Sequence, residues 1–174
     1  MTEHLWPYLR LKADTDKELK EKYRKVFIET YVRDTKGNDI KIYDWHGRRI
    51  RFSPRSFDHA FSESSDYRFG NGFHDRPLSK KRARCILWIK EALAASQGTI
   101  EVMSQYRRDT RGRNRKRRVI LVVEERYVVI IQYRKNTGDY QFITAYVADE
   151  RTILKIKSEG GWLETKKSPS LDGD

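Results

Sequence analysis

The sequence predicts an α+β fold in which N-terminal helices pack on a four-stranded antiparallel sheet, a meander. Apolar side chains recur at helical intervals before residue 96 and alternate with polar ones from residue 99 onward. Because helices precede a run of strands joined by short turns, a parallel sheet is not expected. The 174 residues fit one domain. We assign residues 1–163 to this basic α+β domain and predict that 164–174, whose one apolar residue is Leu171, is a disordered tail.

The first elements are a helix and a hairpin. Residues 14–27 carry Thr15 three positions before Glu18, which is the spacing of a capping box, and apolar residues follow at helical intervals. Residues 40–52 alternate on both sides of a His-Gly pair, and this pattern predicts a β-hairpin.

Two further helices are expected on either side of a loop. Residues 54–63 begin with proline and carry Phe57 and Phe61 four positions apart, with His59 between them. Residues 64–78 are rich in Gly, Asn, Asp and Ser, which predicts a loop. Ser79 can cap a helix over 80–96, whose Ile86, Ile89 and Leu93 give a buried stripe.

The strand pattern that follows predicts the sheet. We expect strands at 99–108, 117–123, 126–135 and 140–149, with a turn at 136–139 that places Gly138 in a left-handed conformation. In the last strand, strict alternation would put Phe142, Thr144 and Tyr146 on one face, with Ile143, Ala145 and Val147 on the other. Two hydroxyl groups would then share a face.

Charge points to a polyanionic partner. The chain has 37 Lys and Arg against 25 Asp and Glu, a net charge of +12. Eight cations lie within residues 107–118, together with a single acid: Arg107, Arg108, Arg111, Arg113, Arg115, Lys116, Arg117 and Arg118. So dense a tract repels itself unless an anion is near, which favours contact with nucleic-acid phosphates. A solvated turn or a localisation-type tract would have the same composition.

The remaining composition excludes several classes. The single cysteine, Cys85, rules out an intramolecular disulfide and a multi-cysteine zinc site, and its apolar surroundings predict a core residue. No apolar run is long enough to span a bilayer, and no signal peptide is visible, so we expect a cytoplasmic protein without a membrane partner. No phosphate-binding glycine loop, serine-hydrolase elbow or zinc-protease motif occurs.

Three segments together resemble a known nuclease superfamily: 57-FDHAF-61, 82-RARCILWIKEAL-93 and the meander over 119–149. They are similar to the group that contains barnase, EndoU, the tRNA-cutting colicins and RelE-type toxins (the BECR fold), and particularly to its phage-associated branch. The resemblance covers residues 52–149. It implies a helical part packed on an antiparallel sheet, with RNA cleavage on the sheet face and no metal or cofactor.

The resemblance also assigns site residues. The helix histidine falls on His59, the Arg-Ala start of a long helix on Arg82, and the late Thr-x-Tyr element on Thr144 and Tyr146. The basic or histidine residue that the family often has soon after the helix histidine has no counterpart here. The second proton-transfer group is therefore left open between His74, Tyr146 and another residue. Without the resemblance, a histidine beside two phenylalanines is more typical of a partly buried helix residue.

Metal-free RNA cleavage needs a proton removed from the 2′-hydroxyl and one given to the departing 5′-oxygen, and it leaves a 2′,3′-cyclic phosphate. Histidine suits proton transfer because its ordinary pKa of ~6.5 is close to neutral. Arg82 can hold the phosphate and Thr144 can donate to an oxygen that gains charge. Tyr146 can donate the proton to the 5′-oxygen, or its ring can serve as a platform on which a nucleobase stacks.

The sequence leaves three functions open. The first is a toxin-like, metal-independent endoribonuclease whose partners are tRNA or another structured RNA and an acidic immunity or antitoxin protein. The second is a non-catalytic RNA- or DNA-binding module in which 107–118 holds phosphates and sheet tyrosines stack on bases. The third is a basic accessory or inhibitor protein that binds an acidic partner. A metal-dependent, restriction-type nuclease is disfavoured because no Asp is followed by Glu-x-Lys on one strand.

Overall fold

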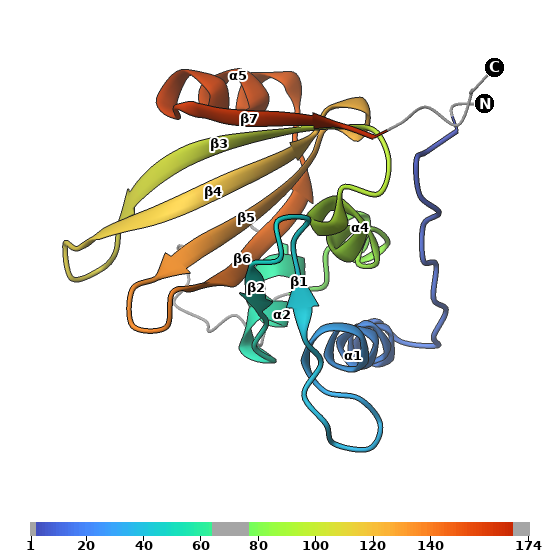
Figure 1. Ribbon diagram of the computed structural model, residues 1–174. Coiled ribbons are helices and arrows are strands. Elements are labelled where there is room, and N and C mark those ends of the chain that lie inside the picture. Colours follow the sequence, from blue (N-terminus) through green and yellow to red (C-terminus); the bar gives the residue numbers. More distant parts are fainter. Residues whose placement is uncertain (1–2, 64–76, 169–174) are drawn as a thin grey trace.

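The computed structural model describes residues 3–63 and 77–168, which form a mixed α+β fold around one curled sheet (Figure 1). The strand order is β1-β2-β6-β5-β4-β3-β7, so the sheet has seven strands where the sequence predicts four. The strands are β1 (Ile42–Tyr43), β2 (Arg49–Arg51), β3 (Thr99–Arg108), β4 (Asn114–Val122), β5 (Tyr127–Arg134), β6 (Asp139–Val147) and β7 (Trp162–Lys167). The predicted fold class is confirmed at this level.

The helices lie on both faces of the sheet. They are α1 (Asp16–Phe27), α2 (Arg55–Phe61), α3 (Lys80–Ala83), α4 (Trp88–Ala94) and α5 (Glu150–Glu159). A π-helical turn, Ile28–Val32, extends α1, and a 3₁₀ turn, Val123–Glu125, joins β4 to β5. The first predicted helix is confirmed, including its cap: the Thr15 hydroxyl accepts a hydrogen bond from the Glu18 amide at 3.1 Å.

The predicted meander forms the centre of the sheet, since β3, β4, β5 and β6 are successive antiparallel neighbours. The predicted hairpin is β1–β2, and β2 joins the meander by pairing in parallel with β6. At the opposite edge β7 pairs with β3, with Thr99 facing Lys167. Residues 164–167 therefore belong to a strand and differ from the predicted disordered tail. Strand pairing is made by the backbone, so this segment needs no apolar side chains to join the edge.

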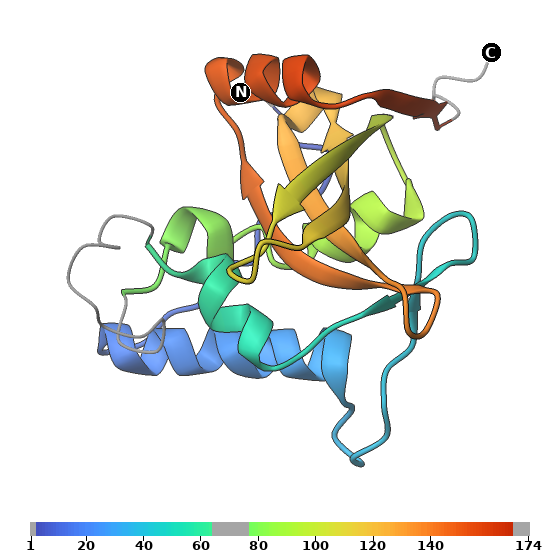
Figure 2. The same cartoon turned by 90° about the vertical axis from the view of Figure 1, so that its left-hand side faces the viewer.

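Two apolar clusters cover the two faces of the meander. One contains Ile120 and Val122 of β4 with residues of α1, α2 and α4, and the other contains Val119 and Leu121 with Ile156 of α5. The alternation along β4 assigns each strand residue to a face. Figure 2 shows α1 beneath α2, with α5 on the far side of the sheet from both. We call the sheet face covered by the first cluster the α2 face and the face covered by the second cluster the α5 face.

A bulge in β6 changes the predicted faces of the last strand. Ile130 faces Thr144, but Ile131 faces Phe142, so Ile143 is the extra residue. Phe142 and Ala145 consequently both lie in the α2-face core, whereas Ile143 and Tyr146 pack on the α5 face. Thr144 stands opposite Ile130, which is also on the α5 face. The predicted sharing of a face by Thr144 and Tyr146 holds, but the placement of Phe142 with them is wrong.

The helix predicted over 80–96 is broken into α3 and α4 because a distant tyrosine enters it. The Tyr31 hydroxyl donates to the Ile86 carbonyl at 2.6 Å and accepts from the Lys90 amide at 3.2 Å. A continuous helix would bond that amide directly to that carbonyl. The Arg84 carbonyl is likewise occupied, since it accepts from the Leu9 amide at 2.8 Å. The side-chain insertion separates the two short helices.

A buried ion pair attaches α2 to α1. Asp58 is 2% exposed, and its two carboxylate oxygens each accept from the Arg24 guanidinium at 2.9 Å. Lys20 lies 3.6 Å from the same carboxylate. The hydrogen bonds to Asp58 are the main cause that raises the pKa of Arg24. Together with the burial of Phe57, Ala60 and Phe61, this contact holds α2 against α1.

We expect Asp58→Ala to lower the free energy of unfolding by about 3–5 kcal/mol, because it leaves two cations at a buried site without their counter-charge. Urea denaturation followed by circular dichroism measures the loss. Glu21→Ala is the matched control: it removes the other carboxylate on Arg24, but Glu21 is 60% exposed, so the loss should stay below about 1 kcal/mol. Equal losses in the two variants would contradict the assignment.

Candidate nucleic-acid interface

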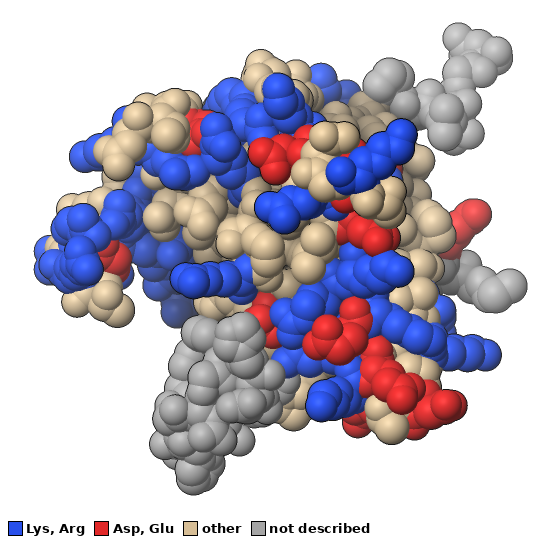
Figure 3. Space-filling model, turned by 90° about the horizontal axis from the view of Figure 1, so that it is seen from below, with Lys and Arg blue, Asp and Glu red and all other residues tan. Residues whose placement is uncertain are grey.

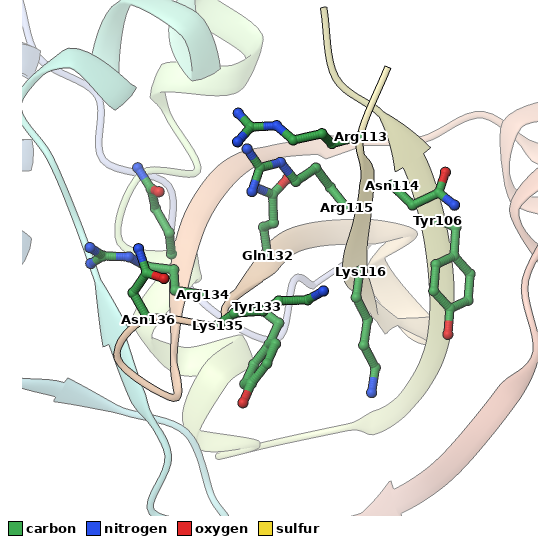
Figure 4. Close-up of a pocket in the computed structure, with 11 residues that line it drawn as sticks. Tyr106, Arg113, Asn114, Arg115, Lys116, Gln132, Tyr133, Arg134, Lys135 and Asn136 are labelled. Carbon is green, nitrogen blue, oxygen red and sulfur yellow. The ribbon is translucent and has the colours of Figure 1, made fainter. Parts of the chain in front are cut away.

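The meander divides into two hairpins that separate at one end. The β3–β4 hairpin is paired down to Arg108 and Asn114, and the β5–β6 hairpin down to Arg134 and Asp139. Between them, β4 and β5 are paired only as far as Arg117 and Gln132. Beyond that pair the two hairpins are no longer joined to each other. The space between them is a pocket of about 830 Å³, which we call the hairpin cleft (Figure 4).

Cations, tyrosines and amides line the hairpin cleft. The cations are Arg113, Arg115, Lys116, Arg134 and Lys135, the tyrosines are Tyr106 and Tyr133, and the amides are Asn114, Gln132, Asn136 and Gln141. No carboxylate is among the described residues that line it. Lysines and arginines gather over the end of the molecule that carries the β3–β4 turn (Figure 3). The cleft thus combines positive charge with groups that can stack and form hydrogen bonds.

The two sides of the cleft differ in character. Figure 4 shows Tyr106, Lys116 and Tyr133 extending to one side of the strands, with Arg113 and Arg115 on the other. Strand alternation gives the same division, because Tyr106 faces Lys116 across the β3–β4 pair on the α2 face. Tyr106 is 66% exposed, so its ring is available for stacking.

Some cleft cations are already paired and others are not. Asp109, in the β3–β4 turn, accepts from Arg113 Nε at 3.1 Å and lies 2.9 Å from Arg115. Arg134 is 3.9 Å from Asp139. Within the described ranges, Lys116 and Lys135 have no ion pair. Among the cations that line the cleft, these two ammonium groups are therefore the ones that no described carboxylate pairs with.

The α5 face next to the cleft carries a further group of arginines. Arg107 and Arg115 face each other across β3 and β4, and Arg117 follows on the same side. Burial and then the charge of Arg107 lower the pKa of Arg117. Arg117 Nε donates to the Gln132 side-chain oxygen at 3.0 Å. A half-buried guanidinium that lies near another guanidinium is stabilised by an anion bound beside it.

The predicted basic tract does not form one surface. Arg113, Arg115 and Lys116 line the cleft, Arg107 and Arg117 lie on the α5 face, and Arg118 lies on the α2 face with its guanidinium 5.3 Å from the centre of the Tyr140 ring. Arg108 and Arg111 are exposed at the tip. Sequence reasoning missed Arg134 and Lys135; the run 132-QYRKN-136, at the end of an apolar strand, was the available signal.

The structure brings Arg82 and Tyr146 together. The Arg82 guanidinium lies 5.2 Å from the centre of the Tyr146 ring and donates to the Ala60 carbonyl at 3.2 Å. Both residues line a second pocket of about 450 Å³, together with Lys81 and Arg84. We call this the Arg82 pocket. Burial raises the pKa of Tyr146, and the charges of Arg82 and Arg107 partly offset that effect.

The other two predicted catalytic residues are placed differently. Thr144 is on the sheet face of Tyr146 but is not among the residues that line the Arg82 pocket. His59 is exposed on α2, whose Phe57, Ala60 and Phe61 are buried in the α2-face core. It does not line the Arg82 pocket either. His74 and Arg76, and the predicted loop except for its last two residues, lie outside the described residues.

Other sequence expectations concern cofactors and burial. Cys85 is buried, and desolvation raises the pKa of its thiol to about 12. Within residues 3–63 and 77–168 no cluster of His, Cys, Asp and Glu could hold a metal ion. The helices of that same part of the chain are too short or too polar to cross a membrane.

Comparison with known proteins finds no relative of this chain. The chain matches no protein-family model, and no similar curated protein or solved structure was found.

The Asp109 carboxylate organises the β3–β4 turn and should titrate at low pH. Hydrogen bonds from the Arg113 and Arg111 amides, followed by the ion pairs, lower its pKa from the usual 3.8 to about 2. Because the folded pKa is below the unfolded one, the contribution to stability is present above pH ~4 and is lost as the pH falls through about 2.

We expect a carboxyl-detected NMR titration to give a midpoint of about 2 for Asp109. In Asp109→Asn, the Arg111 and Arg113 amides should exchange faster with solvent than in the wild type, while the amides of β5 should not change. A midpoint near 3.8 would contradict the described turn.

Proposed function

We propose that the protein binds RNA and that the hairpin cleft holds one strand of it. The observation that carries the proposal is a cleft lined by five cations and two tyrosines, with no carboxylate among its described lining residues. Single-stranded nucleic acid is held by such a combination, in which cations contact phosphates and aromatic rings stack on bases. A loop of tRNA, or of another structured RNA, presents such a strand.

Like the cleft, the protein as a whole favours an anionic ligand. Its net charge of +12 attracts a polyanion from a distance. Lys116 and Lys135 provide charge that the described protein does not compensate, so binding a phosphate beside them needs no ion pair to be broken first. An acidic protein, such as an immunity or antitoxin partner, could use the same cations, and it is the alternative if RNA does not bind.

The test compares two double variants that change the net charge equally. Lys116→Ala with Lys135→Ala removes two cleft cations, and Lys17→Ala with Lys25→Ala removes two cations from α1. We expect the cleft variant to bind an RNA oligonucleotide of about 12 nucleotides roughly tenfold more weakly. The slope of the logarithm of the binding constant against the logarithm of the salt concentration should become smaller in magnitude by about 1.4. Fluorescence anisotropy at several salt concentrations measures both quantities.

The α1 variant should differ from the wild type by less than about twofold, because its lysines attract RNA only at long range. Equal losses in both variants would mean that the hairpin cleft is not the binding site. Absence of RNA binding at moderate salt would instead favour the acidic-protein partner.

A second candidate function is metal-independent cleavage of the bound RNA, and the Arg82 pocket favours it. Arg82 can contact a phosphate while Tyr146, beside it, can donate a proton or hydrogen bond. The charge of Arg107 reaches Tyr146, and Arg107 faces the cleft residue Arg115, so cations continue from the cleft toward this pocket. The resemblance to the barnase, EndoU, colicin and RelE group, in its phage-associated branch, supports the same reaction.

In this reaction the 2′-oxygen loses its proton and attacks the adjacent phosphorus, and the bond from phosphorus to the 5′-oxygen breaks as that oxygen is protonated. The products are a 2′,3′-cyclic phosphate and a 5′-hydroxyl. Thr144, on the same sheet face as Tyr146, is proposed to bind the RNA backbone as it approaches.

We expect the wild-type protein to cut tRNA in excess EDTA and to leave the same sequence intact when it is made as DNA. Arg82→Ala should lower the cleavage rate about 100-fold or more, since it removes a charged contact to the reacting phosphate. Arg33→Ala, an exposed arginine outside the Arg82 pocket, is the control and should cut at the wild-type rate. Intact tRNA with the wild-type protein would exclude cleavage and leave RNA binding as the function.

A further inference from the structure

The Arg82 pocket contains a histidine that sequence reasoning did not consider. His4 lines the pocket together with Arg82 and Tyr146. His4 and Arg82 are 78 positions apart in the sequence, so no local pattern relates the two residues. Among the described residues that line this pocket, His4 is the one imidazole.

His4 is oriented by a carboxylate. Its Nδ1 lies 2.8 Å from Glu125 Oε2, while Glu125 Oε1 accepts from the Leu5 amide at 2.7 Å. The Glu125 side chain is 9% exposed and the His4 side chain 38%. With Nδ1–H donating to the carboxylate, a neutral imidazole has its lone pair on Nε2, where it can accept a proton from a substrate.

Aromatic packing holds the N-terminal segment that carries His4. The His4 ring lies 4.5 Å from the Tyr8 ring and 5.7 Å from the Trp88 ring, between ring centres. Tyr8 stacks on Trp88 at 5.2 Å, and Trp88 Nε1 donates to the Pro7 carbonyl at 3.0 Å. The histidine is therefore fixed in position although it lies near the start of the chain.

The charges of the pocket suit a phosphodiester. Lys81, Arg82 and Arg84 supply three cations. Of the two carboxylates in the described lining, Glu125 contacts His4 and Asp149 caps α5 by accepting from the Thr152 amide at 2.7 Å. Both carboxylates are thus engaged with the protein, which leaves the cations to face a bound anion.

A second histidine–glutamate pair shows that the pairing alone is not the distinguishing feature. His46 Nε2 lies 2.7 Å from Glu164 Oε1, on the β1–β2 turn and β7. That pair does not line the Arg82 pocket. What sets His4 apart is the combination of an oriented imidazole with an arginine and a tyrosine in one pocket.

We propose that His4, held by Glu125, is the proton acceptor for RNA cleavage in the Arg82 pocket. His4 Nε2 takes the proton of the 2′-hydroxyl, the 2′-oxygen bonds to phosphorus, and the bond to the 5′-oxygen breaks as that oxygen takes the proton of the Tyr146 hydroxyl. Solvent then returns a proton to Tyr146 and removes one from His4. This inference rests on the proposed cleavage function and gives His59 no part in proton transfer.

The experiment measures tRNA cleavage in excess EDTA for His4→Gln, Glu125→Gln, His59→Gln and the matched control His46→Gln. We expect His4→Gln to lower kcat about 100-fold or more with KM nearly unchanged. Glu125→Gln should lower kcat about tenfold, because the carboxylate acts by positioning the imidazole. His46→Gln and His59→Gln should stay within about twofold of the wild type.

Chemical rescue separates a catalytic loss from a folding loss. In His4→Gly, imidazole added to the solution should restore part of the lost kcat, which a purely structural role of His4 would not allow. The inference is overturned, with cleavage still established, if His4→Gln keeps the wild-type kcat or if imidazole does not rescue His4→Gly. It is also overturned if His59→Gln loses activity while His4→Gln does not. If the wild type does not cut, cleavage itself is excluded and this inference falls with it.

Discussion

The position of the hairpin cleft depends on where the pairing of β4 with β5 ends. The last β4–β5 pair is Arg117 with Gln132, and extending that register by two residues would place Arg115 opposite Arg134. Like charges directly opposite each other destabilise strand pairing. Arg115 already faces Arg107 on its other side. That Arg107–Arg115 pair belongs to the β3–β4 ladder, where Asp109 lies 2.9 Å from Arg115, so repulsion does not by itself end a ladder. The β4–β5 ladder ends at Gln132, the hairpins separate beyond it, and the cations there line the cleft.

The periodicity of the sequence could predict the meander, but not the features that depend on distant contacts. All four predicted strands correspond to β3, β4, β5 and β6, because alternation and turn residues are local signals. The break after α3 depends on Tyr31, which reaches Ile86 from another helix. The Ile143 bulge leaves no mark on an alternating sequence, and it moves Phe142 to the opposite face. Edge strand β7 was missed because its pairing uses backbone groups of polar residues.

The candidate site was predictable only in part, for the same reason. Composition identified the basic tract, but alternation in β3 and β4 distributes its cations over both faces of the sheet, and the opposite wall of the cleft comes from β5 and the turn after it. Arg82 and Tyr146, which the resemblance names as site residues, lie next to each other, and whether they act on RNA stays a prediction. His4 could not be recognised, because the contact that orients it is with Glu125, 121 positions away.

The bulge in β6 also determines which arginines share a sheet face with Tyr146. By shifting the register at Ile143, it places Thr144 and Tyr146 on the α5 face, where Arg107 and Arg117 lie. Without the bulge, Tyr146 would share a face with Phe142 in the α2-face core and would be separated by the sheet from Arg107. In the proposed mode of RNA binding, a strand that leaves the hairpin cleft toward the Arg82 pocket follows the α5 face, with its phosphates along these arginines. Bases that stack on Tyr106 or Tyr133 must then lie on the other side of the β4–β5 opening, so the bound strand passes between the two hairpins rather than across one flat face.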